Sequence, residues 1–210
     1  MNVLHIDSSA LGEFSASRQL SAAAVNALRE ANPSAHVTYR DLAKEPPPHL
    51  SGQLLQVLRA PPGVEHSSPS ARMVEDVALT EALITELLSS DVLVVGAPMY
   101  NFSIPTPLKA WIDRVVQAGR TFRFVDGRPE GLCTGKRALV VSSRGNRFLG
   151  QPYEQTLDHQ EAYLKAVLNF LGITDVRVVR AEGLAFGAEA RAGAIDGALA
   201  ELNLLGAQFA

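Results

Sequence analysis

Three serines and two small residues surround the turn that follows the first apolar run of the chain. Ser9 comes shortly after that run, and Ser15 and Ser17 flank Ala16 where an amphipathic segment begins. The start of a helix carries unpaired amide N–H groups and a partial positive charge, and both suit a phosphate. The serine hydroxyls add donors, so a phosphate dianion can bind here with few or no cationic side chains. The alternative is that Ser15 or Ser17 simply caps the helix.

Aromatic and sulfur side chains follow another buried run, at residues 92–95. Such side chains can pack against a flat heteroaromatic ring, while an amide bonds to the polar edge of the ring. The residues are Met99, Tyr100, Asn101 and Phe102. The alternative is an irregular loop whose aromatic side chains belong to the core.

A polar loop follows a further buried run, at residues 138–141, and consists of Ser143, Arg144, Gly145 and Asn146. Gly145 and Asn146 tolerate a positive φ, which lets the backbone come close to a ligand. Amides there can meet the carbonyls of a bound ring, where negative charge gathers on reduction. Taken alone, a plain strand-to-helix turn explains this loop equally well.

The 210 residues disfavour several classes of function. There is no Gly-x-Gly-x-x-Gly fingerprint after the first run, no Gly-Lys-Ser/Thr phosphate loop and no Gly-x-Ser-x-Gly elbow. A net charge of −3 offers no basic field for nucleic acid. Cys133 is alone, which indicates a small buried residue, and the five histidines lack ligand spacing, so we expect no metal site. No apolar run is long enough for a membrane span and the first residues do not resemble a signal peptide, so we expect a cytoplasmic protein with no membrane partner.

The elements that must position these loops alternate between buried runs and amphipathic segments. We predict strands at 3–6, 36–39, 92–95, 138–141 and 176–179, and helices at 17–30, 50–58, 74–88, 106–116, 153–171 and 188–205. Gly96-Ala97-Pro98 closes the third strand, Pro69 suits a helix first turn, and Asp126-Gly127 indicates a hairpin. The pattern predicts an α/β fold with a doubly wound five-stranded parallel sheet, helices on both faces and a single domain over residues 1–210. Ligands bind at the carboxyl ends of the strands in such sheets, but the strand order stays open.

With these loops in this order, the chain resembles the FMN-dependent NADH:quinone oxidoreductases, a family also called azoreductases. The matching residues are Ser9 with Ser15-Ala16-Ser17, Met99-Tyr100-Asn101-Phe102, and Ser143-Arg144-Gly145-Asn146. Similar stretches within residues 105–109, 131–136, 172–175 and 181–183 extend the resemblance over nearly the whole chain. The Met-Tyr-Asn-Phe loop after a buried strand is a quite specific motif, whereas the serine turn alone is weak.

The resemblance implies a flavodoxin-like FMN-binding domain and a homodimer with FMN near the subunit interface. It also implies NADH or NADPH as the electron donor, with quinones, azo compounds or sometimes nitro compounds as acceptors. By carry-over, Ser9 and residues 15–17 hold the phosphate, and residues 99–102 and 143–146 hold the ring. The family places aromatic walls of the substrate pocket where Phe124 and Phe170 stand, although core packing is the more ordinary role for both. It usually has a second glycine at the position of Asn146, whose side chain would bond to the ring or clash with it.

Donor and acceptor would use one site in turn, which predicts ping-pong kinetics without an assigned acid–base side chain. Arg18, Arg144 and Arg147 are candidates to meet a nicotinamide phosphate. Other functions stay open. A flavodoxin-type electron carrier would share the FMN site without a substrate pocket, an NAD(P)H:FMN reductase would deliver reduced FMN, and a non-catalytic α/β binding module would hold another ligand or none.

Overall fold

Five strands form a parallel sheet at the centre of the computed structural model, which describes residues 1–60 and 70–206. They are β1 (Asn2–Asp7), β2 (His36–Asp41), β3 (Val92–Pro98), β6 (Arg137–Ser143) and β7 (Asp175–Ala181). Their order is β2-β1-β3-β6-β7, and every pairing is parallel. The chain therefore winds first to one side of β1 and then to the other. Open α/β sheets bind ligands beside the point where the winding reverses, which here lies between β1 and β3.

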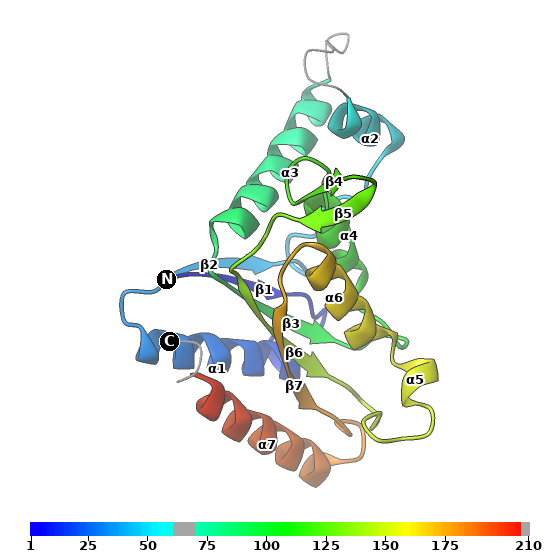
Figure 1. The fold of residues 1–210 in the computed structure, drawn as a ribbon. Helices are drawn as coiled ribbons and strands as arrows, with labels where there is room; N and C mark the ends of the chain where they lie inside the picture. The colour runs from blue at the N-terminus through cyan, green and yellow to red at the C-terminus, as the bar shows by residue number, and fades with distance from the viewer. Residues whose placement is uncertain (61–69, 207–210) are drawn as a thin grey trace.

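Helices cover both faces of the sheet, as the sequence predicts (Figure 1). On one face, α1 (Ala16–Ala31) and α7 (Ala188–Gly206) lie side by side. The other face carries α3 (Ala71–Ser89), α4 (Thr106–Val115) and α6 (His159–Phe170). The shorter elements are the 3-10 turn η1 (Gly12–Phe14), α2 (Gly52–Arg59) and α5 (Glu154–Leu157). Within the described ranges, no helix combines the length and apolar character needed to cross a bilayer.

The side chains of the buried strands contribute to two hydrophobic cores, one on each face of the sheet. In β3, Val92 and Val94 pack with α1 and α7, whereas Leu93 and Val95 pack with α3, α4 and α6. Because both faces are covered, the strands are continuous apolar runs, which is why the sequence indicates them so clearly. Cys133 is fully buried beside α6, and burial raises the pKa of its thiol, so its predicted role as a small buried residue is confirmed.

The predicted hairpin is also present, as β4 (Phe122–Val125) and β5 (Arg128–Gly131). Asp126 and Gly127 both have a positive φ, as the two central residues of a type I′ turn must. The hairpin ends against the chain that leaves α6. A β-carbon on Gly131 would lie 2.2 Å from the Gly172 nitrogen, so only glycine permits this close approach.

The third strand runs further than predicted. Gly96-Ala97-Pro98 does not close β3 but continues it, paired with residues 141–143 of β6. Gly96 is a packing residue rather than a turn residue, because a β-carbon there would lie 2.5 Å from a carboxylate oxygen of Asp7.

The helix predicted at 153–171 is two helices, α5 and α6. The side chain of Asp158 accepts hydrogen bonds from the Gln160 and Glu161 amides and so caps a new helix start. The prediction for Pro69 lies outside the described residues. The helix that follows begins at Ala71, with the Ser70 side chain as its cap.

Candidate functional site

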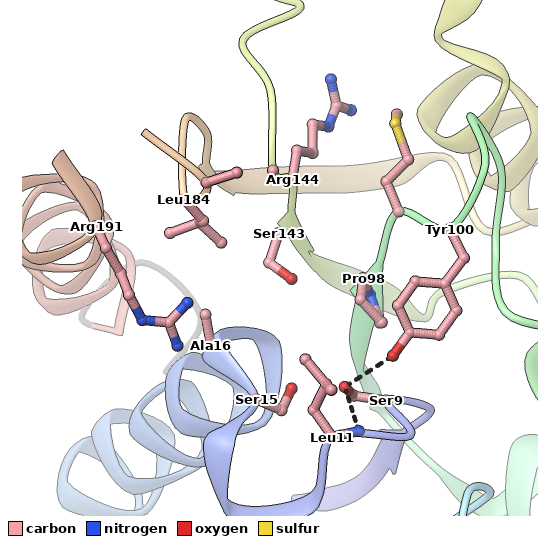
Figure 2. A pocket seen from close by; sticks show the side chains of 13 residues that line it. Ser9, Leu11, Ser15, Ala16, Pro98, Tyr100, Ser143, Arg144, Leu184 and Arg191 are labelled. Atoms are coloured by element: carbon pink, nitrogen blue, oxygen red, sulfur yellow. Dashed lines mark hydrogen bonds between the residues drawn. The ribbon is translucent and has the colours of Figure 1, made fainter. Parts of the chain in front are cut away.

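A cavity lies at the carboxyl ends of β1, β3 and β6, beside the reversal of the winding (Figure 2). It is lined by Ser9, Leu11, Ser15, Ala16, Pro98, Met99, Tyr100, Ser143, Arg144, Gly145, Leu184, Ala185 and Arg191. The structure thus brings residues from all three predicted loops together. Of the predicted cofactor-binding residues, Ser17, Asn101, Phe102 and Asn146 do not line this cavity.

The first turn of α1 offers unpaired amide donors. Ser15 is the N-cap, and its Oγ accepts a bond from the Arg18 amide at 3.2 Å and lies 3.0 Å from the Ser17 Oγ. Within the described residues, the amides of Ala16 and Ser17 have no acceptor. Capping and anion binding are therefore compatible, because the cap uses one amide and leaves two. The Ser17 side chain is buried beneath the turn.

Tyr100 joins the loop after β3 to the loop after β1. Its hydroxyl lies 3.2 Å from the Ser9 Oγ and accepts a bond from the Ala10 amide at 3.1 Å. The Leu11 amide in turn donates to the Ser9 Oγ at 3.3 Å (Figure 2). A flat ring that packs on Tyr100 would therefore meet a wall that hydrogen bonds hold in place.

Asn101 and Phe102 form a tight turn next to the cavity. Their φ angles are 47° and 72°, and the flanking Tyr100 and Ser103 exchange two backbone bonds. A positive φ is rare for a residue as bulky as phenylalanine and is held only by surrounding contacts. One such contact is the bond from the His159 amide to the Phe102 carbonyl. The predicted contact of Asn101 and Phe102 with a bound ring stays a prediction.

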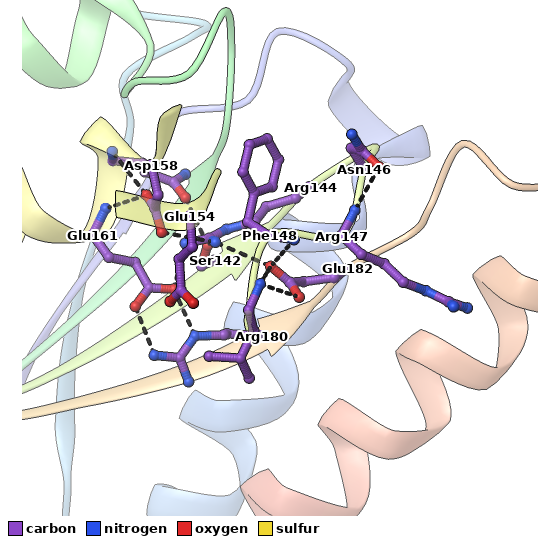
Figure 3. A network of polar contacts seen from close by, with 12 residues as sticks. Ser142, Arg144, Asn146, Arg147, Phe148, Glu154, Asp158, Glu161, Arg180 and Glu182 are labelled. Atoms are coloured by element: carbon purple, nitrogen blue, oxygen red, sulfur yellow. Dashed lines mark hydrogen bonds and ion pairs between the residues drawn. The ribbon is translucent and has the colours of Figure 1, made fainter. Parts of the chain in front are cut away.

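Arg144 contributes its backbone to the cavity, but its side chain lies in a buried ionic network (Figure 3). The guanidinium is 2.9 Å from Asp158 and 3.0 Å from Glu182, and it also pairs with Glu161. Arg180 contacts Glu161 at 2.7 Å. The network ties the end of β6 to the start of α6 and the end of β7. Arg144 is thus already paired and is not placed to meet a nicotinamide phosphate.

Neither Gly145 nor Asn146 has the positive φ that the sequence suggested. The Asn146 Oδ1 accepts a bond from the Arg147 amide at 2.9 Å, and its carbonyl accepts one from the Gly183 amide at 3.0 Å. A β-carbon on Gly145 would touch only the Ala185 side chain, at 3.5 Å. Bonds to the loop after β7 therefore shape this turn, and the Asn146 side chain is engaged within it.

A polar cluster around the buried Asp7 supports the turn between β1 and α1. The Asp7 carboxylate accepts bonds from the Ser21 and Tyr39 hydroxyls at 2.7 and 3.0 Å. Burial, followed by the charge of Asp7, raises the pKa of Tyr39 to about 12. Arg18 lies 2.7 Å from Asp41 and donates to the Tyr39 hydroxyl. Because Arg18 is engaged here and does not line the cavity, it is not placed to meet a ligand there.

Phe124 and Phe170 lie outside the cavity, in an aromatic cluster around Phe122. The ring centroids are 5.7 and 4.7 Å from that of Phe122. Phe124 is 64% exposed and Phe170 36%, so core packing is wrong for both. The hairpin that carries Phe124 lies outside both hydrophobic cores, and Phe170, at the end of α6, belongs to neither core. A place for these two rings in a substrate pocket stays a prediction.

The cavity also has lining residues that the sequence motifs do not indicate, namely Leu11, Pro98, Leu184, Ala185 and Arg191. Leu184 and Ala185 follow β7, so the rule that ligands bind after strand ends would find them if applied to the last strand. Arg191 lies in α7 and belongs to no motif. In the described part of the chain, no group of three or more His, Cys, Asp or Glu side chains is arranged to hold a metal ion.

Comparisons with known proteins identify relatives along the full length of the chain. A family model described as a flavodoxin-like fold matches residues 1–205. The FMN-dependent NADH:quinone oxidoreductase of Azospirillum brasilense is 51% identical over 205 residues, which cover 98% of this chain and 97% of that protein. The protein of the same name from Ralstonia nicotianae is 53% identical over 203 residues, which cover 97% and 96%.

Solved structures share the fold. An azoreductase from Bacillus anthracis str. Sterne matches with a TM-score of 0.88 at 24% identity and covers 99% of both chains. An FMN-dependent NADH-azoreductase from Bacillus anthracis str. Ames Ancestor, in complex with FMN, matches with a TM-score of 0.85 at 22% identity over 98% of this chain. The structural likeness concerns the fold alone, whereas the sequence matches are closer. On these matches, the chain belongs to the flavodoxin-like fold family and, within it, to the FMN-dependent NADH:quinone oxidoreductases.

Proposed function

We propose that this protein is an FMN-dependent oxidoreductase that passes hydride from NADH or NADPH to quinones and azo compounds. The observation that carries the proposal is the convergence of three strand-end loops on one cavity. The cavity combines a helix start that has free amides with a wall of aromatic and sulfur side chains. The names of the relatives, FMN-dependent NADH:quinone oxidoreductase, support the same activity.

The donor set of the cavity fits FMN. The hydroxyls of Ser9 and Ser15, with the amides of the first turn of α1, suit a phosphate dianion. Met99 and Tyr100 suit the face of a flat ring, and the backbone around Gly145 can bond to the ring's carbonyls. When bound there, FMN supplies the hydride and electron chemistry.

The protein's own residues then bind, orient and stabilise charge. Among the described lining residues, the titratable side chains are Tyr100, Arg144 and Arg191, and none is His, Cys, Asp or Glu. We therefore assign no acid–base side chain, and with FMN bound the amides after β6 would stabilise negative charge on the ring. Donor and acceptor would occupy the same place beside the ring in turn, which gives a ping-pong course.

The flavin content of the purified protein and its reduction by NADH test this proposal. We expect bound FMN that NADH bleaches without a second protein, and parallel initial-rate lines at varied donor and acceptor. Intersecting lines would remove the ping-pong course. Bound FMN that no nicotinamide reduces would favour an electron carrier, and release of reduced FMN during turnover would favour an NAD(P)H:FMN reductase. A colourless protein that takes up no FMN would favour a binding module.

We further propose that residues 1–210 form one FMN-binding domain, which acts as a homodimer in the cytoplasm. The resemblance to the family implies the homodimer, and the sequence predicts the cytoplasmic location. Sedimentation equilibrium should give twice the chain mass of 22.5 kDa. A monomer that keeps FMN and activity would refute the dimer and leave the enzyme proposal standing.

A further inference from the structure

Arg191 of α7 lines the cavity, with its guanidinium beside the first turn of α1 (Figure 2). The residue is half-buried, and its Nη2 donates a hydrogen bond to the Phe14 carbonyl at 3.0 Å. No carboxylate in the part of the chain that the structure describes forms an ion pair with it. The guanidinium therefore has donors to spare at the end of the cavity that the serine turn forms.

The groups around Arg191 are mainly positive. It lies in the first turn of α7, where the partial positive charge of the helix start disfavours a cation. Across the cavity wall, the amides of Ala16 and Ser17 also lack acceptors within the described residues. Two sets of positive groups thus converge, and among the described residues the Phe14 carbonyl accepts a hydrogen bond from the guanidinium. An anion between them would satisfy both.

We infer that Arg191 binds the phosphate of the flavin cofactor from the α7 side, opposite the amides of α1, an inference that rests on the proposed FMN function. A guanidinium makes charge-assisted bonds to phosphate oxygens and can do so through two N–H groups at once. The contact ties α7 to α1 across the cofactor and lets the protein distinguish a phosphorylated flavin from riboflavin. The sequence predicts few or no cationic side chains at the phosphate. This inference assigns one cation there, Arg191 of the last helix.

Flavin binding to the apoprotein tests the inference without any measurement of turnover. Quenching of flavin fluorescence gives the Kd of FMN and of riboflavin for the wild type, Arg191→Gln and Arg191→Lys. Arg191→Gln should weaken FMN binding by about tenfold to hundredfold, the range for one charge-assisted hydrogen bond, and should leave riboflavin binding unchanged. Arg191→Lys keeps the charge and should recover part of the FMN affinity.

Arg29→Gln is the matched control. Arg29 is exposed in the last turn of α1, so this variant loses the same charge away from the cavity and should bind FMN like the wild type. Hydrogen exchange adds a second readout. FMN should slow exchange in the first turns of α7 in the wild type and should do so much less in Arg191→Gln.

The outcomes separate this inference from the proposed function. Wild-type FMN affinity in Arg191→Gln would overturn the role of Arg191 and leave the FMN site intact. An equal loss of FMN and riboflavin affinity would also overturn it, because Arg191 would then only hold α7 in place. A wild-type apoprotein that binds neither flavin would refute the proposed function itself.

Discussion

At the start of α1, the Ser15 hydroxyl caps the helix while its residue lines the cavity. Asp caps helices as well as Ser does, and the helix dipole favours a carboxylate there. Ser15→Asp should therefore change the free energy of unfolding by less than about 1 kcal/mol. It should weaken FMN binding by at least about a hundredfold, because like charges in contact cost several kcal/mol. Urea unfolding and flavin titration measure the two effects.

Ser51→Asp makes the same change at another helix cap. The Ser51 Oγ accepts a bond from the Leu54 amide at the start of α2, outside the cavity. FMN affinity should be that of the wild type in this variant. Undiminished FMN binding by Ser15→Asp would mean that the phosphate lies elsewhere.

Tyr39 predicts how stability depends on alkaline pH. Burial and the charge of Asp7 raise its pKa from 10.0 to about 12 in the folded protein, so folding favours the neutral phenol. The stability from Tyr39 is fully present below about pH 10 and is lost as the pH rises through about 12. Tyr39→Phe should therefore flatten the alkaline fall in the free energy of unfolding, measured by urea titration at a series of pH values.

Tyr153→Phe is the comparison for this effect. It removes a hydroxyl that donates to the Arg147 carbonyl, far from Asp7 in the sequence and outside its cluster. Its alkaline limb should keep the slope of the wild type. If Tyr39→Phe kept the slope of the wild type, Tyr39 would not be the source of the alkaline fall in the free energy of unfolding.

Single residues at the site were predictable where chemistry and local position agree. Ser9, Ser15 and Tyr100 follow predicted strands and do line the cavity. Arg144 and Phe124 were less predictable, because burial and partners from distant segments decide where a side chain lies. Arg144 points into carboxylates, and Phe124 lies on a hairpin that no core covers.

At the scale of elements, the Arg144 network is the joint between three of them. Arg144→Met would leave the buried Glu161 and the partly buried Asp158 and Glu182 with one cation fewer. Removing one partner of a buried ion pair costs about 3–5 kcal/mol, so the urea midpoint should fall sharply. If that variant does not fold, Glu182→Gln gives the smaller loss expected from one missing charge.

Arg177→Met serves as the control for the network. Arg177 pairs with Asp175 at 3.2 Å, and both side chains are largely exposed. Losing such a pair costs at most about 1 kcal/mol. Equal effects of Arg144→Met and Arg177→Met would contradict a structural role for the buried network.

Helices and strands were largely predictable because both faces of this sheet are covered, which makes its strands apolar runs bounded by polar loops. Boundaries failed where one residue had two possible roles. The sequence suggests a turn at Gly96, but the glycine instead allows close packing against Asp7. Asp158 fits a polar position within a helix, but it caps the start of α6.

For the whole molecule, FMN should act as a stabilising ligand. At about 100 times its Kd, a ligand that binds only the folded state adds about 2.7 kcal/mol. In a chain of this size each kcal/mol shifts the Tm by about 2–4 °C, so a shift of about 5–10 °C is expected. Adenosine monophosphate, which has a phosphate but no flavin ring, should shift the Tm far less. An unchanged Tm at saturating FMN would contradict binding to the folded state.

For the whole molecule, the sequence predicts where the site lies but not its shape. A doubly wound sheet directs ligands to the carboxyl ends of its strands, and the sequence locates those ends at Ser9, Met99 and Ser143. The strand order could not be predicted from the sequence, because each apolar run is compatible with several neighbouring strands. In the order β2-β1-β3-β6-β7, the three loops and α7 meet at one cavity.

The cavity wall begins at Ser9 and is completed by Arg191, so its parts are synthesised at widely separated times. A nascent chain can form β1, α1 and β3 early, since domains fold from the N-terminal side as they emerge. The binding surface stays incomplete until the last helix clears the exit tunnel. FMN can then load only after α7 has emerged, and a chain terminated before α7 would be released without its flavin.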